Sequence, residues 1–409
     1  MQDTTLYQSI LGLTHPWAVS SVELNESTQT ITVRVDYDRG SLTACPSCGK
    51  AVRRHDTRRR AWRHLDTCQF ETRIEANVPR ADCPEHGVQT LQVPWATSHS
   101  RYTELFETRV IDMLKVSSLY AVSKTYRLSW GAIDRMMTRA VQRGLTARTT
   151  MNYQDLLVDE TAFKKGHDYV TVLSNRDGQV ISVEDGRTGL SLSACFKALP
   201  PESTMVTRSI SMDMSRAYIN AAYDYFGERA KQMIAIDHFH IAKVLTKAVN
   251  EVRKSELMAL PQHLKRECHQ TRYGWLKRNS HLHGTLRERV SALAKMMQNT
   301  GLSWIFKEQA RAIWYGDAAN AKAAWNDWLA LIKVSQIRPM MTAAETVKTH
   351  LKGIINAMRY KVSNGLAEAI NGNIQRLKIR SMGFRNKERF KRAILFHFGG
   401  LDMTFHQER

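Results

Sequence analysis

The feature that most limits the possible folds is the alternation of elements between residues 155 and 254. Short apolar runs alternate with helical patterns in the order strand, hairpin, helix, strand, helix, strand, helix. The sequence N-R-D-G at residues 175–178 indicates the hairpin, because Asn and Gly adopt the backbone conformations of tight turns. Strands joined by helical crossovers form a mixed sheet. The predicted strands are 155–160, 168–175, 179–185, 205–214 and 231–240, and the predicted helices are 188–198, 216–226 and 241–254.

Two acidic residues come where predicted strands end. Asp159 ends the first strand of this region, and Asp213 ends a later one. In open α/β sheets, ligands gather at the carboxyl edge of the strands. Asp224 lies inside a predicted helix and is discounted as a ligand. The pattern therefore predicts that Asp159 and Asp213 face a common site.

A third acid is predicted on a helix over residues 363–379. On a wheel of about 100° per residue, three amide side chains fall within about 60° of Glu368, and the apolar side chains cluster on the opposite side. A solvated helix face would usually mix Glu with Lys. We therefore expect the apolar side to pack on the sheet and Glu368 to face a metal and a phosphate. The amides are Asn364, Asn371 and Gln375, and the apolar residues are Leu366, Ile370, Ile374 and Leu377.

Three clustered carboxylates would repel one another and a phosphodiester unless cations compensate them. Metal ions about 3.5–4 Å apart can stabilise both the attacking and the leaving oxygen of an in-line displacement. Mg²⁺ prefers carboxylate and phosphate oxygens, so this site needs no His or Cys ligand. Asp159, Asp213 and Glu368 are therefore predicted to be catalytic and to bind two Mg²⁺ (or Mn²⁺) ions. The alternative is that each acid is a helix cap or a surface charge.

Two short Cys/His motifs predict a second, structural metal site. C-P-S-C at residues 45–48 and C-P-E-H at residues 83–86 are separated by 34 residues, and alternating patterns at 29–37 and 69–79 predict strands around them. Two turns that each bring two ligands are typical of tetrahedral zinc. The predicted Zn²⁺ ligands are Cys45, Cys48, Cys83 and His86; the alternative is cysteines that only pack or stay free.

Residues 103–145 change to a helical period. The first predicted helix covers 103–116, Ser117 or Ser118 can cap a second, and Ser129 can cap the last over 130–144. This pattern is typical of a helix-turn-helix, although plain packing units share it. Its last helix is predicted to present Arg135, Arg139 and Arg143 along one face.

Charge supports contact with a polyanion. Lys+Arg 59 and Asp+Glu 39 give a net charge of +20. Residues 151–240 carry 12 acids and 9 bases, whereas residues 50–63 carry seven bases and one acid, and residues 373–392 carry eight and one. Basic segments around an acidic centre predict a protein that binds DNA. The predicted DNA-binding residues are Arg53, Arg54, Arg58, Arg59, Arg60, Arg63, Arg135, Arg139, Arg143, Arg376, Lys378 and Arg380.

Other features narrow the class of protein. No apolar run approaches the ~18–20 residues that span a bilayer, and the start MQDTTLYQSILGL is a poor secretory signal. Six cysteines in 409 residues do not make a disulfide scaffold. We therefore expect an intracellular, cytoplasmic protein associated with the nucleoid. Residues 245–350 are almost wholly helical and contain five of the nine tryptophans, which predicts a packed helical insertion.

Taken together, several motifs resemble those of the DDE transposases of bacterial insertion sequences. The most similar branch is the one called ISL-three, in which a zinc finger and a helix-turn-helix precede the catalytic domain. The resemblance extends from about residue 40 to 400. The motifs are V-D-E-T-A-F-K-K-G-H-D-Y-V-T-V (158–172), S-M-D-M-S-R-A-Y (211–218), I-D-H-F-H-I (236–241), N-G-L-A-E-A-I-N-G-N-I (364–374) and S-M-G-F-R-N (381–386).

The resemblance implies a multidomain α/β protein with an RNase H-like core, whose acids fall on Asp159, Asp213 and Glu368. Asp237 and His240 match a C/D-x-x-H signature and are expected to have a supporting role. The alternative interpretation is a metal site at His238 and His240. The implied domains are a zinc-binding finger (1–100), a helix-turn-helix (101–150), a catalytic core (151–244), a helical insertion (245–350) and a segment with the last core helix and a basic tail (351–409).

The implied activity is Mg²⁺-dependent cleavage and strand transfer at the inverted terminal repeats of an insertion sequence. The implied partners are double-stranded DNA, as repeats and as target, and further copies of the chain in a dimer or higher multimer. Two alternatives remain. One is a non-catalytic DNA-binding regulator on a transposase-like scaffold, and the other is a structure-specific nuclease.

Overall fold

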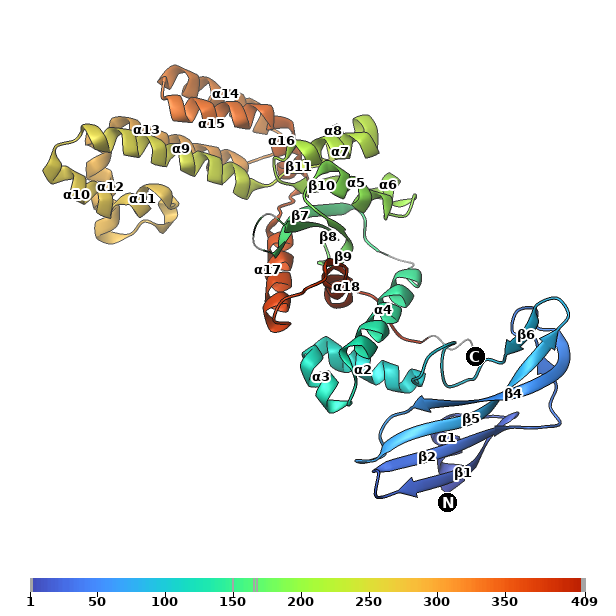
Figure 1. Cartoon of the computed structure of the whole chain (residues 1–409). Helices are drawn as coiled ribbons and strands as arrows, with labels where there is room; N and C mark the ends of the chain where they lie inside the picture. The colour runs from blue at the N-terminus through green and yellow to red at the C-terminus, as the bar shows by residue number, and fades with distance from the viewer. Residues whose placement is uncertain (1–2, 149–150, 165, 167, 406–409) are drawn as a thin grey trace. The chain divides into compact units, whose positions relative to one another are not determined.

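The computed structural model describes residues 3–148, 151–164, 166 and 168–405, except for the side chains of residues 263, 264 and 267. The chain divides into two units, of which one comprises Met1–Ala147 with Asp402–Arg409 and the other Arg148–Leu401 (Figure 1). The finer division into five domains stays a prediction.

The first unit contains a six-stranded sheet in the order β1-β2-β5-β4-β3, with β6 paired to β5. The strands predicted at 29–37 and 69–79 are confirmed as β2 and β5, which pair in parallel. Trp95 makes edge-to-face contacts with Trp17 and Trp62, so three indoles form the centre of this core. The elements are α1 (Asp3–Ile10), β1 (Trp17–Asn25), β2 (Thr30–Tyr37), β3 (Thr43–Ala44), β4 (Ala51–Arg63), β5 (Glu71–Cys83) and β6 (Gly87–Thr90).

Three helices complete this unit: α2 (Glu104–Val116), α3 (Leu119–Thr125) and α4 (Trp130–Thr146). Each begins where a hydroxyl side chain accepts a hydrogen bond from the amide of the third residue on, the N-cap geometry that the sequence predicts for the second and third helices. Ser118 rather than Ser117 caps α3, because Ser117 ends α2. The caps are Thr103, Ser118 and Ser129.

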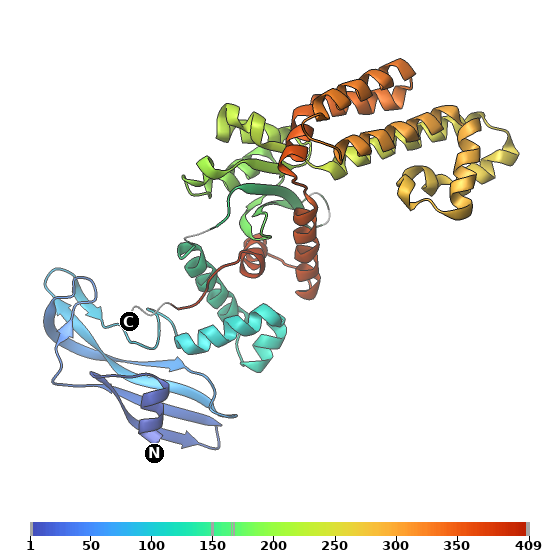
Figure 2. The same ribbon diagram turned by 180° about the vertical axis from the view of Figure 1, so that it is seen from behind.

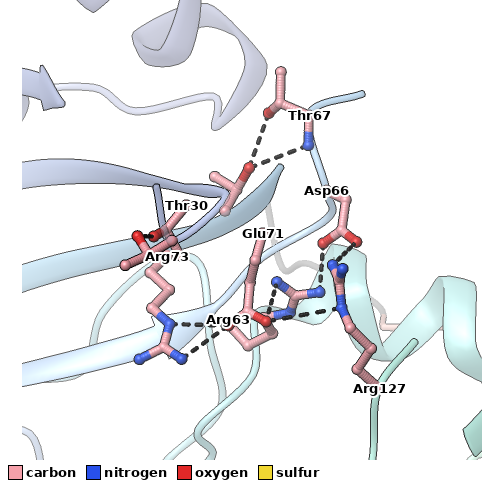
Figure 3. A network of polar contacts seen from close by, with 9 residues as sticks. Thr30, Arg63, Asp66, Thr67, Glu71, Arg73 and Arg127 are labelled. Atoms are coloured by element: carbon pink, nitrogen blue, oxygen red, sulfur yellow. Dashed lines mark hydrogen bonds and ion pairs between the residues drawn. The ribbon is translucent and has the colours of Figure 1, made fainter. Parts of the chain in front are cut away.

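Ion pairs join the helical segment to the sheet within this unit (Figure 3). Arg127, in the turn between α3 and α4, places its guanidinium 2.7 Å from Asp66. Arg63 pairs with the same Asp66 and lies 3.2 Å from Glu71. The Arg63 side chain is only 9% exposed. The prediction that Arg63 contacts DNA is therefore corrected, because its guanidinium is buried and forms ion pairs with Asp66 and Glu71.

The second unit is built on a five-stranded mixed sheet in the order β11-β10-β7-β8-β9. β7 pairs in parallel with β10, and β10 with β11, whereas β7, β8 and β9 are antiparallel. This confirms the predicted sheet with helical crossovers. The strands are β7 (Asp155–Lys164), β8 (Asp168–Asn175), β9 (Val180–Asp185), β10 (Ser209–Met212) and β11 (Ile234–Ile236).

Two strands are shorter than predicted. The strand expected at 205–214 begins only at Ser209, because the preceding residues form the short helix α6 (Ser203–Val206). The strand expected at 231–240 is limited to β11, because α8 (Ala230–Met233) precedes it and Asp237 caps the helix that follows. The capping carboxylate of Asp237 fixes the start of this helix at His238, two residues after the strand ends.

Helices cover both faces of this sheet (Figures 1 and 2). On one face Leu156 and Val158 of β7 pack with residues of α5 (Gly189–Lys197) and α7 (Arg216–Phe226). On the other face Phe163 packs with α17 (Gly365–Arg380) and α18 (Lys387–Phe398). The segment after residue 380 is therefore not simply a basic tail: α18 buries Phe390 and Ile394.

The chain between β11 and α17 is helical, as predicted for residues 245–350, whereas its status as a separate insertion domain stays a prediction. Its long helices α9 and α13 pack side by side, and its tryptophans are buried or half-buried in the core. In the described part of the chain, no helix combines the length and apolarity required to cross a membrane. The helices are α9 (His238–Ala259), α10 (Gln262–Gln270), α11 (Arg272–Leu276), α12 (Gly284–Met296), α13 (Gln298–Trp314), α14 (Ala321–Ser335), α15 (Arg338–Thr349) and α16 (Leu351–Tyr360).

Candidate active site and zinc centre

The four predicted zinc ligands lie together. The ligand atoms of Cys45, Cys48, Cys83 and His86 are all within 4.8 Å of one another. The Cys48 and Cys83 sulfurs are 3.9 Å apart, close to the separation of two thiolates on one tetrahedral Zn²⁺ with Zn–S bonds of about 2.3 Å. A hydrogen bond with His86 lowers the pKa of the Cys83 thiol to about 6, which favours the thiolate that binds metal. The donor set therefore fits a structural Zn²⁺.

Each pair of zinc ligands sits on a turn that ends in a left-handed glycine. Gly49 follows Cys48 with φ +70°, and Gly87 follows His86 with φ +67°. The Gly49 amide donates to the Cys45 carbonyl at 2.8 Å, which closes the first turn. Glycine adopts this conformation without the steric cost that a side chain brings. The two motifs thus share the pattern C-P-x-C/H-G, and the glycine is a local signal of the turn.

The strand register places the two predicted catalytic aspartates at one level of the sheet. Leu157 of β7 is paired with Ser211 of β10 in parallel. Asp159 comes two residues after Leu157, and Asp213 two residues after Ser211, so both follow this last pair by the same distance along the chain. Because parallel strands run in the same direction, this register brings the two carboxylates to the same edge.

Asp159 is largely buried and lies within electrostatic reach of Glu368. Burial raises the pKa of Asp159 to about 6, and the charges of Glu160 and Glu368 contribute to the rise. Such a shift is characteristic of acids at functional sites. Asp159 and Glu368 are therefore close enough to repel each other, as two ligands of neighbouring metal ions would before the metals bind.

The amides around Glu368 do not face solvent but bind the strand that carries Asp159. The pairing of β10 with β7 ends at Leu157, and beyond it α17 runs alongside β7 (Figures 1 and 2). Three side chains of α17 donate to carbonyls of alternate β7 residues. Asn364 donates to Val158 (3.2 Å), Asn371 to Glu160 (3.1 Å) and Gln375 to Ala162 (3.1 Å). We call these three residues the amide ladder.

The amide ladder also leaves oxygen atoms for a cation. The amide oxygens of Asn364 and Asn371 are buried, and no hydrogen-bond donor reaches them within the described residues. Unpaired buried oxygens are rare in folded proteins. Mg²⁺ and its bound waters take oxygen partners of this kind. These oxygens and the acids nearby fit a divalent cation at this edge of the sheet.

Sequence reasoning missed Glu160, which belongs to a second acidic pair. Burial raises the pKa of Glu160, and the charge of Asp213 raises it further. A hydrogen bond with Tyr218 and the charge of His240 act in the opposite direction. The charge of Asp213 also acts on the half-buried His350, which lies between α15 and α16. The only sequence signal for Glu160 was its position next to Asp159, because neighbouring residues in the sequence do not show which acids lie close together in the fold.

The two predicted supporting residues have different surroundings. The buried carboxylate of Asp237 accepts from the amides of Phe239 (3.2 Å) and Asn364 (2.9 Å), so it ties the starts of α9 and α17 together. His240 interacts with Glu160 instead. His238 packs edge-to-face on Trp314, with ring centroids 4.9 Å apart. The histidines at 238 and 240 are thus in separate environments, which does not favour a shared metal.

The three predicted catalytic acids do not form a closed ligand cluster. Among the described residues, only the zinc ligands form a group of three or more whose ligand atoms all lie within 4.8 Å. Ligands of two metal ions need not meet that limit, because acids on opposite ions are separated by the metal–metal distance of about 3.5–4 Å and two coordination bonds of about 2 Å. Metal binding by Asp159, Asp213 and Glu368 stays a prediction.

The three arginines predicted along one face of α4 are not equally available. Arg139 pairs with Glu107, which is 1% exposed. Arg143 donates to the carbonyl of Met403 at 2.8 Å. The idea of a free arginine face is therefore corrected, since two of the guanidinium groups are bound within the unit. Arg135 is exposed.

The other basic residues divide in the same way. Arg53 and Arg58 are exposed on β4, as are Arg376 and Arg380 on α17. Arg376 also donates to the side chain of Asn373 on the same helix, and the remaining predicted contacts likewise have partners inside their own unit. Arg54 donates to the Asp38 carbonyl (3.2 Å), Arg59 pairs with Glu75 (2.7 Å), Arg60 lies over the Trp62 ring (5.0 Å) and Lys378 donates to the Ala162 carbonyl (3.0 Å).

Comparison with known proteins agrees with this architecture. A family model described as transposase matches residues 156–394. A zinc-finger of transposase IS204/IS1001/IS1096/IS1165 matches residues 41–86, and the helix-turn-helix domain of transposase family ISL3 matches residues 91–141. The chain belongs to the ISL3 family of transposases.

Two relatives match over nearly their whole length. The transposase for insertion sequence element IS1001 of Bordetella parapertussis is 27% identical over 98% of this chain and 99% of its own. The transposase for insertion sequence element IS1557 of Mycobacterium tuberculosis is 24% identical over 95% of this chain and 94% of its own. The chain is thus a transposase of an insertion sequence, with a zinc ribbon and a helix-turn-helix ahead of an RNase H-like mixed sheet.

Replacing a zinc ligand tests the metal centre. The purified chain is expected to contain one equivalent of zinc, and Cys45→Ser to lose it together with the fold of its sheet edge, because three ligands do not close a structural site. Elemental analysis measures the metal. Cys68→Ser is the control, since Cys68 is an exposed cysteine outside the cluster. Equal zinc in both variants would contradict the assignment.

The environment of Asp159 gives a prediction about pH. Because the folded pKa of Asp159 is about 6 and its ordinary value 3.8, the folded state binds the extra proton between these values. Stability from this group is therefore lost as the pH rises through that window. Without metal at pH 7, Asp159→Asn should therefore be more stable than the wild type, by up to about 3 kcal/mol in the free energy of unfolding, and should unfold at a higher temperature. Near pH 4 the two proteins should unfold at the same temperature.

Thermal unfolding in the presence of a chelator measures this difference. The exposed Asp224 provides the control variant Asp224→Asn, for which we expect no such dependence. A gap between Asp159→Asn and wild type that stays constant from pH 4 to pH 7 would show that Asp159 is not held in a costly environment.

A third prediction concerns the amide ladder. Asn371→Ala leaves the Glu160 carbonyl without its donor, which should cost about 1–3 kcal/mol of stability and displace Glu368 relative to Asp159. Thermal unfolding and DNA cleavage measure the two effects. Asn326→Ala is the matched control, because Asn326 is exposed on α14, outside the proposed site. If both variants behave alike, the ladder does not hold the site.

Proposed function

We propose that this transposase binds the inverted terminal repeats of its element and catalyses divalent-metal-dependent strand cleavage followed by strand transfer to target DNA. The observation that carries the proposal is the placement of the acids. The register puts Asp159 and Asp213 at one sheet edge, and Glu368 acts electrostatically on Asp159. Membership of the transposase family supports the same chemistry.

Phosphoryl transfer requires positioning and charge compensation, and the residues of this edge supply both. Two Mg²⁺ ions, when bound, would activate the attacking water or 3′-hydroxyl and stabilise the leaving oxygen. Asp159, Asp213 and Glu368 would hold them. The ladder residue Asn371 keeps Glu368 in register with β7, and Asp237 fixes the start of α17 through the amide of Asn364.

The exposed cations provide the phosphate contacts of the proposed complex. Arg53, Arg58 and Arg135 belong to the first unit, and Arg376 and Arg380 to the second. The first unit would recognise the repeat through α4 and the zinc ribbon, and the second would bind the strand to be cut. Since a transposase must join two element ends, the proposal includes a dimer or higher multimer, acting on DNA at the nucleoid.

Replacing the acids one at a time tests this proposal. Asp159→Asn, Asp213→Asn and Glu368→Gln should each lower Mg²⁺-dependent cleavage of a terminal-repeat duplex by at least about 10³-fold, because each removes a ligand that compensates charge in the transition state. Repeat binding should persist. Gel separation of the labelled products measures cleavage and strand transfer, and a mobility shift measures binding.

Asp224→Asn is the matched control, because this exposed acid lies on α7 away from the strand ends. A variant that cleaves at the wild-type rate would remove its residue from the site. Cleavage by the wild type without joined products would identify a nuclease instead, and binding without any cleavage would identify a regulator.

A further inference from the structure

The chain leaves α17 through a helix end with an unusual residue. Met382 has φ +55° and its side chain is 94% exposed. The Met382 amide donates to the Ile379 carbonyl at 2.9 Å, and the Gly383 amide to the Lys378 carbonyl at 2.8 Å. These two bonds define a Schellman motif, in which the left-handed position is usually glycine.

Among the residues of this unit that the structure describes, none makes a contact that accounts for methionine at that position. The left-handed conformation is unfavourable for any residue with a Cβ. An apolar side chain that stays in water also gains nothing from burial. Met382 thus combines a strained backbone conformation with an exposed apolar side chain, and it lies at the end of the helix that carries Glu368. This combination indicates that its side chain contacts a partner molecule.

The surroundings of Met382 indicate what kind of partner it meets. Ile379 is 76% exposed one turn earlier, so the two form an apolar tip. Arg380 and Arg385 are exposed on either side, within a segment, residues 373–392, that carries eight bases and one acid. An apolar tip flanked by cations is complementary to a ligand that has an anionic surface and an apolar interior. Duplex DNA has this order, with phosphates outside the stacked bases.

We propose that Met382, supported by Ile379, is a wedge that inserts between neighbouring bases of the bound duplex. Met is one of the residues that proteins use to unstack a base step, and its flexible, polarisable thioether adapts to the stack. The inference rests on the proposed function, and it adds a site of DNA distortion to it. The cations beside the tip would hold the flanking phosphates.

Helix geometry limits where the distortion falls. Met382 is 14 residues after Glu368 in the chain, and α17 covers the first 12 of them with an advance of about 1.5 Å per residue, or about 18 Å. A base pair occupies about 3.4 Å of the duplex. The unstacked step should therefore lie within about six base pairs of the cleaved bond.

The test uses the full chain and a duplex that spans the junction between the element's end and its flank. 2-Aminopurine, which brightens when it is unstacked, replaces one base at a time over ten positions on each side of the junction. All variants are made in the Asp159→Asn background, which we expect to bind the duplex without cutting it. We expect brightening at one step near the junction with the wild-type Met382 and with Met382→Leu, and its loss with Met382→Gly.

Met382→Gly is informative because glycine suits the left-handed position, so this variant should unfold at the same temperature as its parent or a higher one. Met258→Ala removes another exposed methionine, 79% exposed on α9, and should leave the brightening intact. Equal brightening with Met382→Gly, or no brightening at any position of a duplex that Asp159→Asn binds and the wild type cuts, would overturn the wedge while the proposed function stands. Failure of the wild type to bind the duplex would remove the proposed function, and the wedge with it. Loss of binding to phosphatidylserine vesicles on Met382→Gly, without any change in DNA stacking, would assign the tip to a membrane instead.

Discussion

The catalytic sheet depends on how the open edge of β7 is satisfied. Beyond Leu157 the strand β10 no longer pairs with β7, yet the β7 chain continues to Lys164. Buried carbonyls without partners are costly, so something must donate to them. Asn364, Asn371 and Gln375 do so from α17. The helix thus replaces a neighbouring strand, and the same bonds fix the position of Glu368 along β7.

This arrangement links fold and chemistry in one set of contacts. A helix held only by apolar packing could slide or rotate by a small amount at little cost, whereas directional bonds to alternate carbonyls allow one register. Asp237 adds a further constraint, because it accepts from the first residues of α9 and from Asn364. Burial raises the pKa of Asp159, which precedes Glu160 in β7. The raised pKa of Asp159 therefore lowers stability locally, at the edge of the sheet that is proposed to bind cations.

Patterns within short stretches of the sequence were enough to predict many features of this fold. The ligand pairs at 45–48 and 83–86, the hydroxyl caps of the helices and the order of strands and helices are properties of a few consecutive residues, and the structure has them. Patterns that depend on a distant partner were not predictable in the same way. Arg139 and Arg143 have the spacing of a helix face, but their partners Glu107 and Met403 are far away in sequence.

The amide face of α17 shows the same limit from the other side. Its amide residues lie on the Glu368 side of the helix, as predicted, but their hydrogen bonds to the β7 carbonyls were not predicted. The sequence does not show that β10 stops short of Asp159, and without that fact the carbonyls that need donors cannot be foreseen. The role of an amide depends on what its neighbours leave unpaired. For the same reason Glu160 was missed, because only the folded sheet shows that its neighbour is Asp213.

The path of the chain extends this argument to the first unit. The chain leaves that unit after Ala147 and returns to it at Asp402. On its return the Met403 carbonyl accepts from Arg143, and the Phe405 ring lies 3.7 Å from the same guanidinium. The last turn of α4 is therefore completed by residues from the far end of the sequence. The contacts of Arg143 with residues 403–405 can form only after the second unit has been synthesised, because that unit lies between them in the chain. The final packing of α4 therefore depends on the whole chain, although the motifs of the first unit lie within short stretches of sequence.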